Sequence, residues 1–243
     1  PAKWKVSLPV YYSYGETRIK PLFNPYEPDV RLDNLKENEH FSAEDIRKLK
    51  FNSLDYMKRK GLNFTNVRID GLKRAGAKPM PWDVSNFSVT YAYTETFRRN
   101  INIHHNILKQ YRGNITYGFQ LQPKSWKPFN KMKIFENKWF ALIKDFNLQP
   151  LPNRFGVSMD VTRNYSELLN RDITSFYTNS DDRTLTQYNK QFLVMRIYDF
   201  RWDFSKALKF DYTANNDGRI LEPYGAIDTK EKKDTIKRNM RGF

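Results

Sequence analysis

Apolar and polar residues alternate with a period of two in several segments of the chain. Between residues 208 and 214, every second residue is apolar, and the residues between them are Lys209, Asp211 and Thr213. A strand turns successive side chains to opposite faces, so the pattern predicts strands with one apolar face and one wet, charged face. A soluble sandwich buries the apolar face against a second sheet, whereas a membrane barrel turns it toward lipid around a polar lumen.

Seven runs show this alternation and together predict an all-β chain. They cover residues 4–14, 87–97, 115–121, 139–148, 155–161, 198–204 and 208–214. The run at 139–148 is apolar on both faces at its start, so its phase stays open.

The connections between these runs alternate between longer and shorter lengths. In chain order they cover residues 15–84, 98–110, 123–137, 149–153, 166–190 and 205–207. Up-and-down membrane barrels have short turns at one rim and long loops at the other. The spacing therefore favours an up-and-down antiparallel transmembrane barrel over a Greek-key sandwich.

Two charged segments outside the strand runs are predicted as short helices. Ser42 is a suitable N-cap for a helix over 43–60, inside the long loop 15–84. Asp228 is a candidate N-cap for a helical tail over 228–241. We see no repeat and no linker that would divide two domains, so residues 1–243 are predicted to form one partial barrel segment of about seven strands.

Composition narrows the class of protein further. Lys and Arg number 42 against 27 Asp and Glu, which gives a net charge of +15, and the mean hydropathy is -0.79. No stretch approaches the roughly 18 consecutive apolar residues of a spanning helix. Aromatic residues make up 16% of the chain, a high share that suits the aromatic girdles of a barrel. The chain begins at Pro1 without Met or a secretory signal, so we expect an excerpt of a longer polypeptide.

If the apolar face of each run faces lipid, its positions should carry no charged residue. An Arg or Lys at the bilayer midplane of a barrel costs roughly 2–4 kcal/mol. Arg196 is the exception among the outward series, and it lies six residues before Trp202, roughly 20 Å along a strand. We therefore expect Arg196 at a rim. An odd number of strands leaves free edges, which should pair with strands outside this chain.

No motif predicts catalysis, a cofactor or a metal site. The sequence has no Gly-rich phosphate loop, nucleophile elbow or zinc-protease motif, and no cysteine. His104 and His105 are adjacent, so they should point to opposite faces of a strand and not share a metal. Asp181 and Asp182 are typical of a turn, because no further oxygen ligands follow at the spacing of a calcium loop. We predict neither enzyme activity nor a cofactor.

Two alternatives to a membrane barrel stay open: a soluble β-sandwich or barrel that binds a partner, and a nucleic-acid binder. The net charge and the aromatics suit a phosphate groove with stacking platforms. The basic residues, however, are spread through predicted loops and the tail rather than along one strand face, which argues against a nucleic-acid partner. They include Lys58, Arg59, Lys60, Arg98, Arg99, Lys230, Lys232, Lys233, Lys237 and Arg238.

Several strand and turn sequences are similar to one known family. They are Leu8-Pro-Val-Tyr-Tyr-Ser-Tyr14, Pro21-Leu-Phe-Asn-Pro-Tyr-Glu-Pro-Asp-Val30, Asn63-Phe-Thr-Asn-Val-Arg68, Asp83-Val-Ser-Asn-Phe-Ser88, Tyr91-Ala-Tyr-Thr-Glu95, Tyr111-Arg-Gly113, Lys144-Asp-Phe-Asn-Leu148 with Pro150 and Pro152, Trp202-Asp-Phe-Ser-Lys206 and Leu208-Lys-Phe-Asp211. In this order they resemble the SprA/Sov family of outer-membrane proteins of gliding motility and type IX secretion.

The resemblance implies one slice of a very large single-chain barrel in the outer membrane of Bacteroidota-type Gram-negative cells. Folded cargo proteins would leave the cell through the polar lumen of this translocon. The implied partners are the lipid bilayer, the remaining strands of the same barrel, a PorV-like shuttle, plug proteins and secreted cargo. No catalytic role is implied.

Strand phase alone assigns the side chains to faces, because no functional residue of the family transfers to a position here. The residues predicted to face the lumen are Ser88, Thr90, Thr94, Thr116, Gln120, Ser158, Asp160, Asp199, Arg201, Lys209 and Asp211. The residues predicted to face lipid or form the aromatic girdle are Tyr91, Tyr93, Tyr117, Phe119, Phe200, Trp202, Phe210 and Tyr212.

Overall fold

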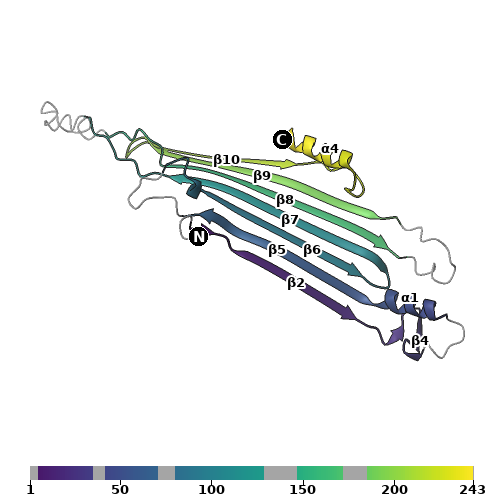
Figure 1. Cartoon of the computed structure of the whole chain (residues 1–243). Helices are drawn as coiled ribbons and strands as arrows, with labels where there is room; N and C mark the ends of the chain where they lie inside the picture. Colours follow the sequence, from purple (N-terminus) through teal and green to yellow (C-terminus); the bar gives the residue numbers. More distant parts are fainter. Residues whose placement is uncertain (1–4, 35–41, 71–79, 129–146, 172–184, 243) are drawn as a thin grey trace.

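The computed structural model describes residues 5–34, 42–70, 80–128, 147–171 and 185–242. These residues form one layer of eight strands and a small two-stranded ladder (Figure 1). The layer contains β1 Val6–Ser7, β2 Val10–Ile19, β5 Asp55–Ile69, β6 Phe87–Arg99, β7 Ile103–Gln120, β8 Arg154–Asn170, β9 Gln187–Asp203 and β10 Lys209–Arg219. The ladder pairs β3 Phe23–Asn24 with β4 Glu27–Arg31. The prediction of an all-β, antiparallel chain is confirmed.

Long strands that follow one another in the chain lie next to one another in the layer. The order is β1-β5-β6-β7-β8-β9-β10, and β2 pairs with the same edge of β5 as β1. Every pair is antiparallel. Within the part of the chain that the structure describes, β2 and β10 each have a neighbour on one side only. Both long edges of the layer are therefore open.

The predicted helix over 43–60 is wrong in its second half. The helix α1 covers Ala43–Ser53, and the predicted long loop 15–84 contains β5. Lys58, Arg59 and Lys60 alternate between the faces of β5, which is hydrogen-bonded to β2 on one side and β6 on the other. Two ladders outweigh the local helix propensity of this charged segment.

The predicted alternation of long and short connections is also wrong. At the end of the layer beside α1 (the α1 end), strands are joined by residues 20–54, 100–102 and 171–186. At the opposite end (the Trp202 end), residues 70–86, 121–153 and 204–208 join them. Each end has short and long connections, because β5 divides the first predicted loop and β7 and β9 begin earlier than their runs. Most of the predicted strand at 139–148 lies outside the described residues, although Leu148 forms an isolated bridge with Trp126.

Three short helices accompany the sheet in the described ranges, and none of them is long and apolar enough to cross a bilayer. They are α1, the 3-10 helix η2 Val84–Asn86 and α4 Lys230–Arg241. The predicted helical tail over 228–241 is thus shortened at its start. Its N-cap is Thr229, whose side chain accepts a hydrogen bond from the Lys232 amide, instead of Asp228.

The packed cores are small and lie under the helices. Leu49 of α1 is fully buried beside Leu32 and Ile46, and Ile236 of α4 packs with Phe192 and its neighbours. The accessible surface is 18106 Å², whereas a compact monomer of this mass exposes about 11,000 Å². The described strands have no second sheet stacked on them (Figure 1). Most of the layer is therefore open on both faces.

Candidate functional site

One face of the layer is polar. Residues opposite each other in an antiparallel ladder point to the same side, and the register joins Ser88, Thr116 and Ser158 in one row. We call this side the polar face. All the residues predicted to line a lumen lie on it: Ser88, Thr90, Thr94, Thr116, Gln120, Ser158, Asp160, Asp199, Arg201, Lys209 and Asp211. That they line a lumen stays a prediction.

The centre of the polar face is a hydrogen-bonded network. The Asn114 amide nitrogen donates to Asp160 at 2.8 Å and to Ser158 at 3.2 Å, and the Thr116 hydroxyl donates to the Asn114 oxygen at 2.9 Å. Asn114 was missed because the predicted run began at residue 115. The signal was available, since Arg112, Asn114 and Thr116 continue the polar alternation into β7.

Ion pairs follow on the same face toward the Trp202 end. Arg154 lies 2.9 Å from Asp199, and Arg201 lies 3.4 Å from Asp203 and 3.6 Å from Asp211. These side chains are partly exposed, so each pair adds little stability. Their effect is to keep this face wetted and close to charge balance.

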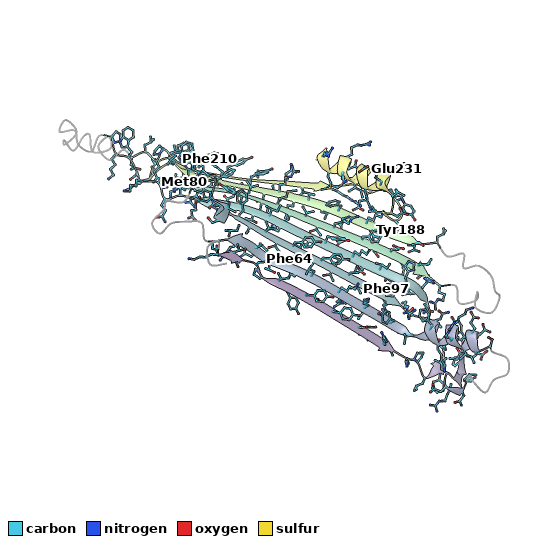
Figure 2. The ribbon with its side chains drawn as sticks, viewed as in Figure 1. Phe64, Met80, Phe97, Tyr188, Phe210 and Glu231 are labelled. Carbon is cyan, nitrogen blue, oxygen red and sulfur yellow. The ribbon has the colours of Figure 1, made fainter. Side chains whose placement is uncertain are left out.

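The opposite side carries the aromatic residues, and we call it the aromatic face. It holds every residue predicted to face lipid or form a girdle: Tyr91, Tyr93, Tyr117, Phe119, Phe200, Trp202, Phe210 and Tyr212. Many of its side chains are exposed, for example Ile115 at 51% and Tyr212 at 52%. Figure 2 shows the side chains standing out on both sides of a single layer of strands.

An apolar belt crosses the aromatic face over the half nearer the Trp202 end. It is formed by the aromatic-face positions within residues 10–14, 62–64, 87–93, 111–119, 155–161, 192–202 and 210–214. Rings pack across strands along it, with Phe87 and Tyr117 centroids 4.9 Å apart and Tyr93 and Tyr111 centroids also 4.9 Å apart. Such pairs add about 0.5–1.5 kcal/mol beyond area burial.

The belt ends abruptly at a row of ionic residues. The register aligns Lys60, Glu95, Lys109 and Lys190 on adjacent strands, with Tyr165 between the last two. We call this set the ionic row. At the other limit, near the Trp202 end, the Tyr117 hydroxyl donates to the Pro81 carbonyl at 2.7 Å, and the Trp202 indole donates to that of Gln149 at 2.9 Å. Aromatic rings with polar tips thus border the belt where the loops begin.

The structure corrects the predicted position of Arg196. Because β9 begins at Gln187, Arg196 lies in mid-strand on the aromatic face, level with Met159 and Asn216. It is therefore inside the belt and not at a rim. Arg196 and Asn216 form a polar break in the belt, next to the open edge of β10.

The two adjacent histidines lie closer together than the strand pattern predicted. The register shifts between Ile103 and His105, and the Nδ1 atoms of His104 and His105 are 3.0 Å apart. The prediction that the two side chains point to opposite faces is wrong, because a β-bulge at this position interrupts the strand alternation. His105 also faces the Glu167 carboxylate at 3.1 Å. Within the described ranges, no group of three or more His, Cys, Asp or Glu is placed to hold a metal ion.

Residues 220–229, which we call the strap, and α4 cover the aromatic face beside the ionic row. The Glu222 carboxylate accepts two hydrogen bonds from Arg163 of β8, at 2.5 and 2.9 Å. The Lys190 ammonium donates to the Pro223 carbonyl at 2.6 Å and to that of Gly225. These contacts attach the strap to β8 and β9.

Asp228, next to the last residue of the strap, has a lowered pKa. Its own backbone amide donates a hydrogen bond to the carboxylate, and Lys232 lies 3.4 Å away. Both interactions favour the ionised form. The carboxylate therefore stays charged at the start of α4.

Neither a family model nor a curated protein matches the chain. The features of the molecule that bear on its function are the two faces of the layer. They differ in chemistry over most of their area, and no described element covers the greater part of either.

Proposed function

We propose that the layer is a section of the wall of an outer-membrane β-barrel, and that the barrel is a protein-translocation channel. In this proposal the apolar belt faces lipid and the polar face lines the lumen. The observation that carries it is the exposed apolar belt, which ends at the ionic row. A soluble protein would bury such a surface, since large exposed apolar patches are unfavourable in water.

The dimensions of the belt support a membrane environment. On β7 it extends from Tyr111 to Phe119, and on β9 from Phe192 to Trp202. At about 3.4 Å per residue, these stretches are about 27 and 34 Å long. Barrel strands tilt by about 35–45°, which reduces the heights to about 20–28 Å, in agreement with an apolar band of about 25 Å.

The open edges of β2 and β10 support further strands on both sides of the layer. An unpaired edge of a long strand presents a row of free backbone donors and acceptors, which cannot be left unsatisfied in lipid. In this proposal, the remaining strands of the same barrel pair with both edges.

The kind of channel rests on the resemblance to the SprA/Sov family. It adds type IX secretion and gliding motility as the process, folded proteins as cargo, and a PorV-like shuttle and plug proteins as partners. The polar face agrees with such a lumen, because hydroxyl, amide and balanced ionic groups make up most of it, although Leu193, Met195 and Ile197 of β9 also point to this side. The protein acts as a passage and not as an enzyme.

Cysteine labelling tests the orientation of the faces, because the chain has no cysteine. We expect Thr116→Cys to react with a water-soluble maleimide in membranes on the order of tenfold faster than Ile115→Cys, because hydrocarbon suppresses the reactive thiolate. The labelled fraction is measured by the mass shift of the protein. Both variants should react completely after denaturation. Equal rates in intact membranes would contradict the proposal and favour a soluble β module.

A further inference from the structure

A cavity of about 660 Å³ lies between α4 and the aromatic face of β7, β8 and β9. The sheet contributes Lys109, Tyr111 and Phe192 to its walls. In Figure 1, α4 lies over the side of the layer that carries β8 and β9, away from the loops at both ends. The cavity is therefore part of the outer surface of the proposed wall.

The helix that covers the cavity is firmly attached. Ile236 is 8% exposed and packs in one cluster with Phe192 and Val194. The Asn239 side chain donates to the Leu221 carbonyl at 2.8 Å, and the Lys232 ammonium donates to that of Ala226 at 2.8 Å. These contacts hold α4 against the sheet, so the cavity is formed by attached elements on both sides.

Cations dominate the polar part of the cavity. Lys109 and Lys233 line it and have no ion-pair partner in the described part of the chain. Lys237 also lines it, 3.6 Å from Asp234. The carboxylate in the lining is Asp228, which already faces Lys232. The helix as a whole has six basic residues and two acidic ones.

The cavity also crosses the border of the apolar belt. Tyr111, Val161 and Phe192 belong to the belt, whereas Lys109 belongs to the ionic row. Apolar and cationic walls therefore meet within one space. An amphiphile with an anionic head and an apolar tail matches both walls, whereas a small soluble anion matches only the cations.

We propose that this cavity binds the phosphate headgroup of an anionic lipid. Lys109 and Lys233 hold the phosphate by charge-assisted hydrogen bonds, and Val161, Phe192 and Met240 contact the first part of the acyl chains. The proposal rests on the proposed function, because it requires the apolar belt to face lipid. The ionic row then lies at the level of the headgroups.

Lipid binding by the purified protein in mild detergent tests the site. We expect native mass spectrometry to show tighter binding of phosphatidylglycerol than of phosphatidylcholine. The double variant Lys109→Gln, Lys233→Gln should lose about 30-fold in affinity for phosphatidylglycerol, as two lysines near an anionic lipid surface account for. The matched control Lys230→Gln, Arg241→Gln removes two cations of α4 that do not line the cavity, and its affinity should change less than threefold.

Three outcomes would overturn the lipid site. They are equal binding of the two lipids, equal losses in the double variant and its control, and full displacement of the lipid by inorganic phosphate, which would indicate a site for soluble anions. Protection of α4 from trypsin shows whether each variant keeps the helix in place. Cysteine labelling of residues 115 and 116 tests the proposed function separately, so a failed lipid site and a failed membrane orientation give different results.

Discussion

In the proposed membrane orientation, replacing Ile115 by arginine is expected to destabilise the inserted protein by roughly 2–4 kcal/mol, the cost of a cation near the bilayer midplane. Ile115 is 51% exposed and lies on the aromatic face between Val89 and Met159, in the middle rows of the belt. No described residue of opposite charge lies on the same row of these three strands. The folded fraction in lipid vesicles, measured against urea, should fall accordingly.

The matched control is Thr116→Arg, the next residue of β7, which points to the polar face beside Ser88 and Ser158. We expect a change of about 0–1 kcal/mol there, because the added cation stays in water. Phe210→Arg should also cost less than Ile115→Arg, since Phe210 lies at the limit of the belt near the Trp202 end (Figure 2). Equal losses at residues 115 and 116 would contradict the assignment of the faces.

Which side chains lie on the same face of the layer could be predicted from the sequence, because strand geometry determines it. Successive side chains of a strand point to opposite sides, so the phase of a short run determines the phase of the whole strand. The runs at 115–121 and 155–161 were both shorter than β7 and β8, yet they placed Thr116 and Ser158 on the same side.

Strand ends and one whole strand could not be predicted in this way. On β5, Lys58 and Lys60 occupy aromatic-face positions beyond the belt, so apolar alternation is lost there although the strand continues. The same loss hides the first residues of β7 and β9, where polar residues such as Lys109, Gln110, Lys190 and Gln191 occupy both faces. Hydrophobic periodicity marks the part of a strand with one apolar face, and it fails where the strand continues with polar residues on both faces.

The position of Arg196 within the belt and the packing of α4 on the aromatic face depend on tertiary structure. A local pattern does not reveal that β9 begins at Gln187, nor that α4 folds back onto β8. Ile236 and Met240 are four residues apart in the sequence, about one helical turn, which gives the charged helix α4 an apolar side. The sequence did not show which surface that side would meet, because both faces of the layer were possible partners.

Replacing Glu222 by glutamine is expected to weaken the attachment of the strap and α4 to the sheet. The Glu222 side chain is 2% exposed, and its two hydrogen bonds satisfy Arg163, which is 24% exposed. Breaking a buried pair costs 3–5 kcal/mol because one charge stays buried without its partner. The residual exposure of Arg163 favours the low end, about 3 kcal/mol, so trypsin should cleave α4 on the order of a hundredfold faster where cleavage follows the opening equilibrium.

Two further variants identify the cause of this loss. Asp234→Asn removes the exposed pair with Lys237 on α4, where the side chains are 48% and 68% exposed, and should change the cleavage rate less than threefold. The double variant Arg163→Met, Glu222→Leu removes both charges and should lose less protection than Glu222→Gln alone, since a buried pair can be replaced by apolar side chains at little cost. If the double variant loses as much, the strap is held by the shape of Glu222 and its backbone contacts, and not by the ion pair with β8.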